Sequence, residues 1–318
     1  MIALDVMGGD HAPHAVLDGS LRAAKKSIPI MLFGPATFVR DELTKLDPSW
    51  QQYPLTICDA PVIVAMDDEP VFAVRKKPTS SLVKAVESVK SGQCMSALSA
   101  GNSGALMAAA TFLLGREEGV ERPAIAGLMP TLQGNVLMLD LGANTDCRPQ
   151  HLVQFAHLGV AYALQTLKIN NPRVGLLSNG HEEGKGSQLV KDAFALLKQE
   201  STINFIGNVE PYDLLESKVD VVVCDGFAGN VLLKTMETTF ELCMQLLRND
   251  LKAQSDNPAV ATWGKQFMQK VAGKLNHKRF GGALLLGVKG NVIVCHGSSD
   301  AQTIEQAIQF AWETTNKR

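Results

Sequence analysis

The stretch VDVVVCDGFAGN, residues 219–230, shows the pattern that decides the fold. Its first half, Val219–Cys224, is a mostly β-branched and apolar run of the kind that forms a buried strand. The glycine-rich loop Asp225–Asn230 follows, and Val231–Leu251 then has helical spacing. We therefore interpret this region as a strand, a loop and a helix in succession, which is the repeating unit of α/β proteins.

The same alternation runs along the whole chain. We predict further strands at Ile2–Leu4, Ile28–Phe33, Leu55–Cys58, Cys94–Leu98, Ile125–Leu128, Val136–Leu141, Val174–Leu177, Ile203–Ile206, Ala283–Gly287 and Asn291–Cys295. Further helices are predicted at Ser80–Ser91, Gly104–Leu114, His151–Leu167 and Gln188–Gln199. This order predicts a mostly parallel sheet covered by helices on both faces. The last two strands are joined by three residues, so we expect them to form an antiparallel hairpin.

No linker, repeat or change in composition divides the chain. We expect a single α/β domain over residues 1–318, with a protruding helical segment at about 235–280.

The composition is typical of a soluble globular protein. Hydrophobic residues make up 46% of the chain and charged residues 19%, and the formal net charge is −2, so we expect no nucleic-acid partner. The six cysteines form no C-x-x-C pair, which favours buried thiols in a reducing compartment. The N-terminus lacks the basic segment of a signal peptide, and no apolar run reaches the roughly 18 residues of a membrane span. We expect a cytoplasmic protein.

Five loops between a predicted strand and the next helix are rich in Gly, Asn and Asp. They are Met7–His11, Ser99–Gly104, Leu141–Asp146, Leu177–Ser187 and Asp225–Asn230. Each alone is an ordinary connection, because Gly and Asn are common in turns. In parallel sheets, however, such loops gather beyond the carboxyl ends of the strands, where backbone N–H groups and helix N-termini attract anions. Together they predict a pocket for a small anionic or carbonyl-bearing substrate.

The loop LSNGHEEGKGS, residues 177–187, resembles a nucleotide-binding P-loop without matching it. Its first two glycines are separated by only three residues, and Gly186 stands where a P-loop has Ser or Thr after its lysine. Lys185 lies near a helix start, where the helix dipole disfavours a cation, so its position favours a role as a point charge for phosphate. Glu182 and Glu183 argue against a polyphosphate. We therefore interpret the loop as the site of one small phosphate.

Several polar residues at the loop ends have two interpretations. Asn102 and Asn230 either cap helices or donate side-chain amide hydrogens to a developing oxyanion. Asp140 and Asp225, each near the end of a predicted strand, either orient Lys185 or a histidine or cap turns. The sequence decides neither question.

The histidines and cysteines do not form a pattern typical of metal or covalent chemistry. His11, His181 and His296 lie in glycine-flanked loops, but no H-x-x-x-H pair or His/Cys cluster accompanies them. Cys295 and His296 are neighbours, and neighbours in a strand point to opposite faces. No G-x-S-x-G nucleophile motif occurs. We expect no metal and no cofactor, and the roles of the three histidines stay open.

Two basic clusters and one apolar stripe also have two interpretations each. The clusters Arg75–Lys77 and Lys274–Arg279 are either solvated faces or docking sites for an acidic protein. The stripe is a core or dimer contact, or else a helix face that touches lipid opposite basic residues. It consists of Val260, Trp263, Phe267, Val271 and Leu275.

Long motifs along the chain resemble one known family. They are IALDVMGGDHAP at residues 2–13, SAGNSGALMAAA at 99–110, LDLGANTDCRPQHLVQFA at 139–156, RVGLLSNGHEEGKG at 173–186, NFIGNVEP at 204–211, VVVCDGFAGNVLLK at 221–234 and GNVIVCHGSSD at 290–300. In this order they are similar to the phosphate acyltransferases of bacterial phospholipid synthesis, the PlsX family. The resemblance implies a three-layer α/β/α sandwich like that of isocitrate and isopropylmalate dehydrogenases and phosphotransacetylases. It also implies a homodimer, with peripheral membrane association in some members.

The activity that the resemblance implies is transfer of a long-chain fatty acyl group from acyl carrier protein to inorganic phosphate. The product, acyl phosphate, feeds phospholipid synthesis. The resemblance points to Lys185 and Asn230 as catalytic residues. The expected substrate-binding residues are Asn102, Ser103, Asn144, Ser178, Asn179, Gly180, Gly186, Asp225, Gly226 and Gly229.

One part of the Lys185 loop departs from the family pattern. The commoner family form has an acidic, less glycine-rich segment before Lys-Gly, so the role of His181 is left open. Two other functions remain as alternatives. The first is a short-chain phosphotransacetylase that uses acyl-CoA. The second is a non-catalytic scaffold that binds acyl carrier protein at the membrane surface.

Overall fold

The computed structural model describes residues 1–253, 258–275 and 281–316. Within the chain, contacts cluster into two compact units. Unit 1 consists of Met1–Gly127, Leu164–Ile169 and Phe280–Arg318, and unit 2 of Leu128–Ala163 and Asn170–Arg279. That the chain forms a single domain stays a prediction.

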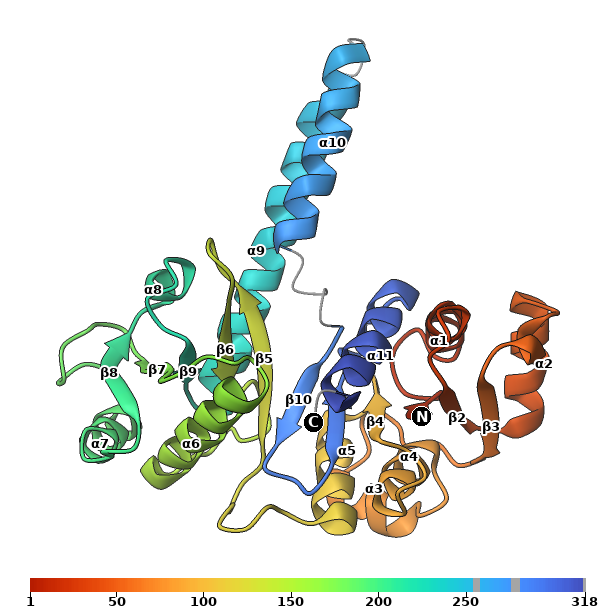
Figure 1. Ribbon diagram of the computed structural model, residues 1–318, viewed down its shortest axis with the longest axis horizontal. Helices are drawn as coiled ribbons and strands as arrows, with labels where there is room; N and C mark the ends of the chain where they lie inside the picture. Colours follow the sequence, from red (N-terminus) through yellow and green to blue (C-terminus); the bar gives the residue numbers. More distant parts are fainter. Residues whose placement is uncertain (254–257, 276–280, 317–318) are drawn as a thin grey trace. The chain divides into compact units, whose positions relative to one another are not determined.

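Unit 1 is built on a mostly parallel sheet (Figure 1). Its strands lie in the order β3 (Leu55–Asp59), β2 (Ile30–Gly34), β1 (Ile2–Asp5), β4 (Ser96–Ser99), β11 (Asn291–Val294), β10 (Ala283–Leu286) and β5 (Ala124–Pro130), whose last residues belong to unit 2. β10 runs antiparallel to β11 and β5, whereas the other pairs of this unit are parallel. The antiparallel hairpin predicted from the short connection is therefore confirmed.

Two groups of helices cover this sheet (Figure 1). One group contains α1 (His14–Lys25) and α11 (Ala301–Asn316), which pack along each other, with α2 (Ala36–Leu46) beside them. The other contains α4 (Ser81–Lys90), α3 (Pro70–Lys76), α5 (Ser103–Ala109) and the π-helical turn η2 (Ala110–Leu114). A short 3₁₀ turn, η1 (Trp50–Gln52), precedes β3. The strands supply the core, with Leu4, Ile30 and Leu98 at most 1% exposed.

Unit 2 has an all-parallel set of strands in the order β6 (Asn135–Leu139), β9 (Val221–Val223), β7 (Arg173–Leu177) and β8 (Asn204–Val209). Its shorter helices are α6 (Pro149–Gln165), α7 (Gln188–Leu197) and α8 (Pro211–Leu215). The three valines of β9 are fully buried, as expected of a parallel strand covered on both faces. The predicted class, α/β with a mostly parallel sheet flanked by helices, is confirmed.

Two long helices complete unit 2 and run side by side as a hairpin, α9 (Gly226–Ala253) and α10 (Pro258–Leu275) (Figure 1). Gly264 makes close packing possible, because a Cβ atom there would lie 2.6 Å from Cδ2 of Leu251. Trp263 is 59% exposed and stacks on Phe267 with ring centroids 5.0 Å apart, so it is not a core residue. The side chains of Val260 and Leu275, the ends of the predicted stripe, lie outside the described residues. Among the helices that the structure describes, none is long and apolar enough to cross a bilayer.

Candidate functional site

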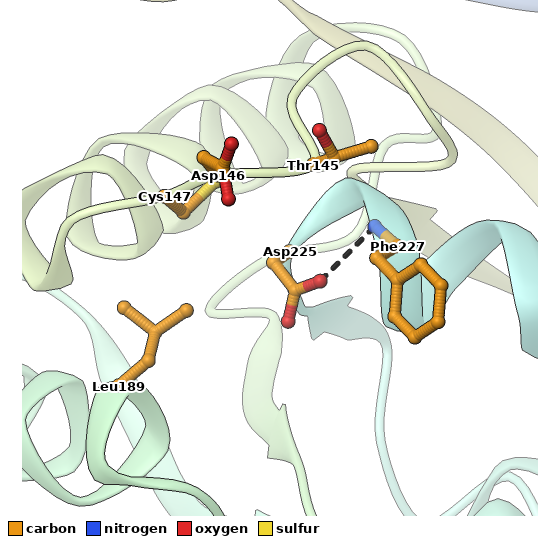
Figure 2. A pocket seen from close by; sticks show the side chains of 6 residues that line it. All are labelled: Thr145, Asp146, Cys147, Leu189, Asp225 and Phe227. Atoms are coloured by element: carbon orange, nitrogen blue, oxygen red, sulfur yellow. Dashed lines mark hydrogen bonds between the residues drawn. The ribbon is translucent and has the colours of Figure 1, made fainter.

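Two loops of unit 2 and the first turns of two helices border a pocket of about 400 Å³ (Figure 2). Its lining comes from the loop after β6, from Asp225 just before α9, and from the first turns of α7 and α9. The lining residues are Thr145, Asp146, Cys147, Leu189, Asp225 and Phe227. Because β6, β7 and β9 are parallel neighbours, the loops that follow them emerge at one edge of the sheet. The segments after β6 and β9 therefore gather as the sequence predicted, and α7, which follows the Lys185 loop, borders the same pocket.

Two carboxylates, the buried Asp140 and the half-buried Asp225, hold the loops around this pocket in place. Asp140 is fully buried and accepts hydrogen bonds from the backbone N–H groups of residues 142–144, at 2.6 to 3.3 Å, and from Nδ2 of Asn144 at 2.9 Å. Asp225 accepts the N–H groups of residues 227 and 228, at 3.0 and 2.9 Å, and so caps α9. The structure therefore gives both aspartates the turn-capping role.

Glycines allow the loops after β6 and β9 to approach each other closely. The N–H of Gly226 donates to the carbonyl oxygen of Asn144 at 2.7 Å, and a Cβ atom on Gly226 would lie equally close to that oxygen. A Cβ atom on Gly229 would lie 1.9 Å from the carbonyl oxygen of Asp140. A side chain at Gly229 is therefore incompatible with the present packing of the two loops.

Asn230 follows directly and lies against the loop after β6. A Cβ atom on Gly142 would be 3.7 Å from Cβ and Cγ of Asn230. The side chain of Asn230 is exposed and makes no hydrogen bond with any residue in the described part of the chain. The two aspartates accept hydrogen bonds from the backbone, whereas the side-chain amide of Asn230 can still donate to a ligand.

The loop between β7 and α7 carries Lys185 and is held by its own polar groups. Oδ1 of Asn179 accepts the N–H of Gly186 at 2.8 Å, and Gly186 has φ +94°, a conformation that favours glycine. The N–H of Ser178 donates to the carbonyl oxygen of Val209 at the end of β8, at 2.9 Å. The buried Oγ of Ser178 has no hydrogen-bond partner among the described residues.

Lys185 is exposed and lies three residues before the start of α7. Its stem rests on Gly180, where a Cβ atom would be 2.8 Å from Cγ of the lysine. Within the described ranges, no carboxylate lies within ion-pair distance of its ammonium group. Glu183 pairs instead with Lys198, whose Nζ is 2.6 Å from Oε1. The lysine therefore keeps its charge available beside a helix N-terminus.

Asn102 and Ser103 belong to unit 1, whereas the residues described above belong to unit 2. Oδ1 of Asn102 accepts the N–H of Ala105 at 3.0 Å and caps α5, and Nδ2 donates to the carbonyl oxygens of residues 65, 66 and 68 at 2.9 to 3.3 Å. The side chain is almost fully buried, with both ends of its amide engaged. Its hydrogen bonds therefore fit the capping interpretation. Ser103 is exposed at the start of α5.

The three loop histidines have different surroundings. His181 contacts Asp213, with Nε2 2.7 Å from Oδ2. His296 lies in a turn where its Nδ1 is 2.8 Å from Oγ of Ser298, and His11 is exposed. Burial raises the pKa of the Cys295 thiol to about 12, so Cys295 is not activated by its exposed neighbour.

Five pocket-lining residues were not among those predicted from the sequence: Thr145, Asp146, Cys147, Leu189 and Phe227. Four of them lie within the family motifs given above, so their position in a motif could have identified them as site residues. Leu189 lies just beyond such a motif, in the first turn of α7. With the side chain of Phe227, which is 65% exposed, it gives the pocket an apolar wall.

Solved structures of other proteins share this fold. The chain is similar to a phosphotransacetylase from Streptococcus pyogenes, with a TM-score of 0.62 and 17% identity, covering 99% of this chain and 94% of that one. It is also similar to a branched-chain phosphotransacylase from Enterococcus faecalis V583, with a TM-score of 0.59, 15% identity and 99% of each chain covered. At these identities the likeness shows the fold alone.

The chain belongs to the family whose model is described as fatty acid synthesis protein, which matches residues 1–318. A phosphate acyltransferase of Anaeromyxobacter sp. (strain Fw109-5) is 44% identical over 98% of this chain and 86% of its own length. A phosphate acyltransferase of Bacillus pumilus is also 44% identical, over 99% of this chain and 94% of its own length. The family resemblance noted in the sequence is confirmed, and the chain is a transferase of the acyltransferase class.

Proposed function

We propose that this chain transfers a long-chain fatty acyl group from acyl carrier protein to inorganic phosphate, giving acyl phosphate for phospholipid synthesis. The names of its relatives and the description of its family support this reaction. The observation that carries it is Lys185, which has no carboxylate partner among the described residues and lies just before α7, whose first turn borders the same pocket as the loops that hold Asp225 and Asn144. A phosphate held there meets a pocket with an apolar wall.

The reaction needs little from the protein besides positioning and charge. An oxygen of phosphate attacks the carbonyl carbon of the thioester, and the carbonyl oxygen becomes an oxyanion. The C–S bond then breaks, the thiolate takes a proton from solvent, and acyl phosphate remains. Phosphate is already an anionic nucleophile near neutral pH, and thiols ionise near pKa ~8.5, so neither an activated serine nor a strong general acid is required.

The roles follow from this chemistry. Lys185 and the N–H groups at the start of α7 hold phosphate, and the hydroxyl of Ser178, 3.1 Å from the Cβ position of Gly186, is a further donor. The side-chain amide of Asn230, with backbone N–H groups of neighbouring residues, receives the oxyanion. Correct orientation of two reactants contributes about 7–11 kcal/mol in favourable cases, and a single oxyanion donor about 2.7–4 kcal/mol. Orientation of the two reactants by the whole site, to which Lys185 contributes one contact, is therefore the larger contribution.

Glu182 is the residue that we expect to exclude polyphosphates. Its Oε2 would be 3.0 Å from a Cβ atom on Gly180, so its carboxylate lies beside the stem of Lys185. Glu183 has its charge offset by Lys198. The sequence assigned exclusion to both acids, and the contacts favour Glu182 alone.

Docking of the acidic acyl carrier protein is proposed at Arg75 and Lys76. The guanidinium of Arg75 lies 5.6 Å from the ring centroid of Phe112, and Nζ of Lys76 lies 5.9 Å from that of Phe72. Both rings are more than half exposed, so an acidic partner would meet cations and apolar surface together. Lys77 pairs with Asp68 and contributes less charge. Lys278 and Arg279 of the second cluster lie outside the described residues.

The homodimer and the peripheral membrane contact are also proposals. Leu242 and Leu246 of α9 are 59% and 56% exposed, and Trp263 of α10 is 59% exposed. Exposed apolar side chains on one long hairpin support contact with a second copy or with lipid.

Replacing Lys185 by Met tests the assignment of the site. Loss of a charge-assisted hydrogen bond of about 1.5–3 kcal/mol predicts a roughly 10- to 100-fold fall in acyl phosphate formation. The matched control is Lys191→Met, which removes an exposed lysine of α7. A folded K185M protein that keeps a tenth or more of the normal rate contradicts the assignment.

A further inference from the structure

The Lys185 loop contains a second basic side chain, His181, which contacts two carboxylates. Nε2 of His181 is 2.7 Å from Oδ2 of Asp213, and its Nδ1 is 3.6 Å from Oε2 of Glu210. The side chain of Asp213 is only 7% exposed, whereas that of His181 is 60% exposed. An accessible imidazole thus anchors its loop to a buried carboxylate in α8.

Other bonds join the same loop to β8. Nδ2 of Asn208 donates to the carbonyl oxygen of Glu182 at 2.9 Å, and the N–H of Lys185 donates to the same oxygen at 3.0 Å. With the bond between Ser178 and Val209 at the start of the loop, these contacts seat the chain on the end of β8. The pair formed by His181 adds a charged contact at residue 181.

Residue 181 lies where a movement of its backbone would change the position of the Lys185 side chain. It directly follows Gly180, the residue on which the stem of Lys185 rests, with Cγ and Cδ of the lysine 2.8 and 3.2 Å from the Cβ position of the glycine. A shift of the backbone at residues 180 and 181 therefore moves the surface that supports the lysine. The contact with Asp213 fixes that backbone from the other side.

We propose that His181, through its ion pair with Asp213, is a positioning residue that holds Lys185 for phosphate, so that phosphate affinity falls as the imidazolium loses its proton. This inference rests on the proposed function, because it assumes that Lys185 binds phosphate. It assigns a role to a residue for which the family resemblance provides none.

The charges around the imidazole favour its protonated form. The hydrogen bond to Asp213 and the charge of that carboxylate raise the pKa of His181, Glu210 raises it further, and partial burial and Lys218 oppose the shift. For Asp213, burial acts to raise the pKa, but bonds from the Glu210 backbone and from His181 outweigh it, so its pKa is lowered. Lys218 pairs with Glu216, with 2.6 Å between Nζ and Oε2, and its Nζ also lies 3.5 Å from Oδ1 of Asp213.

The sign of the pH effect follows from that direction. Because the folded-state pKa of His181 is raised above its ordinary value of 6.5, the ion pair is fully formed below that value. It is lost as the pH rises through the raised pKa. A neutral imidazole still donates one hydrogen bond to Asp213, so the contact weakens and loses its charge without vanishing.

The test measures kcat and KM for inorganic phosphate from pH 6 to pH 9 in the wild type, in His181→Gln and in a matched control. His157→Gln is the control, because Nε2 of His157 is 3.2 Å from Oε2 of Glu200 in another histidine–carboxylate pair of unit 2, away from the Lys185 loop in the sequence. Glutamine keeps an N–H donor but cannot acquire charge. Exchange of a charge-assisted bond for a neutral one predicts a roughly fivefold higher KM for phosphate at pH 6. We expect kcat to stay nearly unchanged, since binding common to ground and transition states affects KM.

The shape of the pH profile separates this role from a general loss of structure. Phosphate itself titrates in this range, so the informative quantity is the ratio of the KM of His181→Gln to that of the wild type. The ratio should approach one at high pH, while the His157→Gln ratio stays near one throughout. A ratio that is constant with pH, or a fall in kcat with KM unchanged, overturns the proposal.

A direct measurement of phosphate binding tests the positioning role without relying on the proposed acyl transfer activity. Calorimetric titration of the same proteins with inorganic phosphate should show the same pH-dependent weakening in His181→Gln. If the wild type binds phosphate with this dependence but makes no acyl phosphate, the proposed function fails and the positioning role stands. Equal phosphate affinity of wild type and His181→Gln at pH 6 overturns the positioning role.

Discussion

Adding one methyl group at Gly229 should force apart the loops that follow β6 and β9. A Cβ atom there would lie 1.9 Å from the carbonyl oxygen of Asp140, and contacts under 3.0 Å are essentially never made by real Cβ atoms. The two segments must therefore separate by about 1.1 Å or more. Asn230, the next residue, moves with the start of α9.

The expected consequences of Gly229→Ala concern both stability and turnover. Overpacking of this kind typically costs about 1–3 kcal/mol, occasionally more. A displacement near 1 Å at a positioned group can lower the rate roughly 100-fold. Urea unfolding followed by circular dichroism measures the first effect, and acyl phosphate formation measures the second.

Gly184→Ala is the matched control for stability, because the structure shows no atom within 4 Å of a Cβ at that position and no positive φ there. Its unfolding free energy should stay within about 0.5 kcal/mol of the wild type, as for ordinary surface changes. If Gly229→Ala does not fold, Gly226→Ala is the milder test, with its Cβ at 2.7 Å from the oxygen of Asn144. Gly229→Ala with wild-type stability and wild-type turnover would refute the close packing of these loops.

Three further predictions follow from contacts elsewhere in the chain. Asn102→Ala should lower the unfolding free energy by about 1–3 kcal/mol in urea, because it removes the cap of α5 and the donor to three carbonyl oxygens. At pH 8, iodoacetamide should modify exposed Cys243 at least about 100-fold faster than Cys295, whose pKa is raised to about 12 by burial, as peptide mass spectrometry would show. Replacing Arg75 and Lys76 by Glu should raise KM for acyl carrier protein roughly fivefold at low salt and weaken its salt dependence.

Each of these predictions has a result that contradicts it. Unchanged unfolding of Asn102→Ala would mean that its four hydrogen bonds contribute nothing to stability. Labelling of Cys295 as fast as Cys243 would show that the core around β11 opens readily. For charge reversal, Arg40→Glu combined with Lys90→Glu makes the same charge change at other exposed positions of unit 1. Equal KM values for the two double variants would rule out docking at Arg75 and Lys76.

The strands could be predicted from the sequence because a buried parallel strand is a short continuous apolar run. Val221–Val223 and Asn135–Leu139 were found in this way to within two residues at each end. The helices α1 and α11 were not among the predicted helices. Each buries its apolar face against the other from opposite ends of the chain, and a local pattern does not reveal such a contact.

The first residue of α9 could not be predicted correctly for a different reason. The sequence predicted the helix from Val231, because the preceding residues are rich in glycine and have poor helix propensity. The structure begins α9 at Gly226, since Asp225 caps it and tight packing against the loop after β6 requires glycines there. Tertiary contact decides the boundary in this case.

The candidate site was predictable in its loops but not in the role of each side chain. The family motifs indicated the loops that carry Lys185 and Asn230, and both side chains are exposed without a polar partner in the described chain. Whether Asn102 caps a helix or faces a ligand depended on carbonyl oxygens more than 30 residues earlier in the chain. Such long-range hydrogen bonds have no local signature.

The most direct measurement is acyl phosphate formation by the purified protein from inorganic phosphate and palmitoyl-acyl carrier protein, compared with acetyl-CoA as the donor. Phosphorus NMR or trapping with hydroxylamine identifies the product. We predict turnover with the palmitoyl carrier and none with acetyl-CoA. Turnover with acetyl-CoA alone would make the chain a short-chain phosphotransacetylase, and binding of the carrier without any turnover would contradict the proposed reaction altogether.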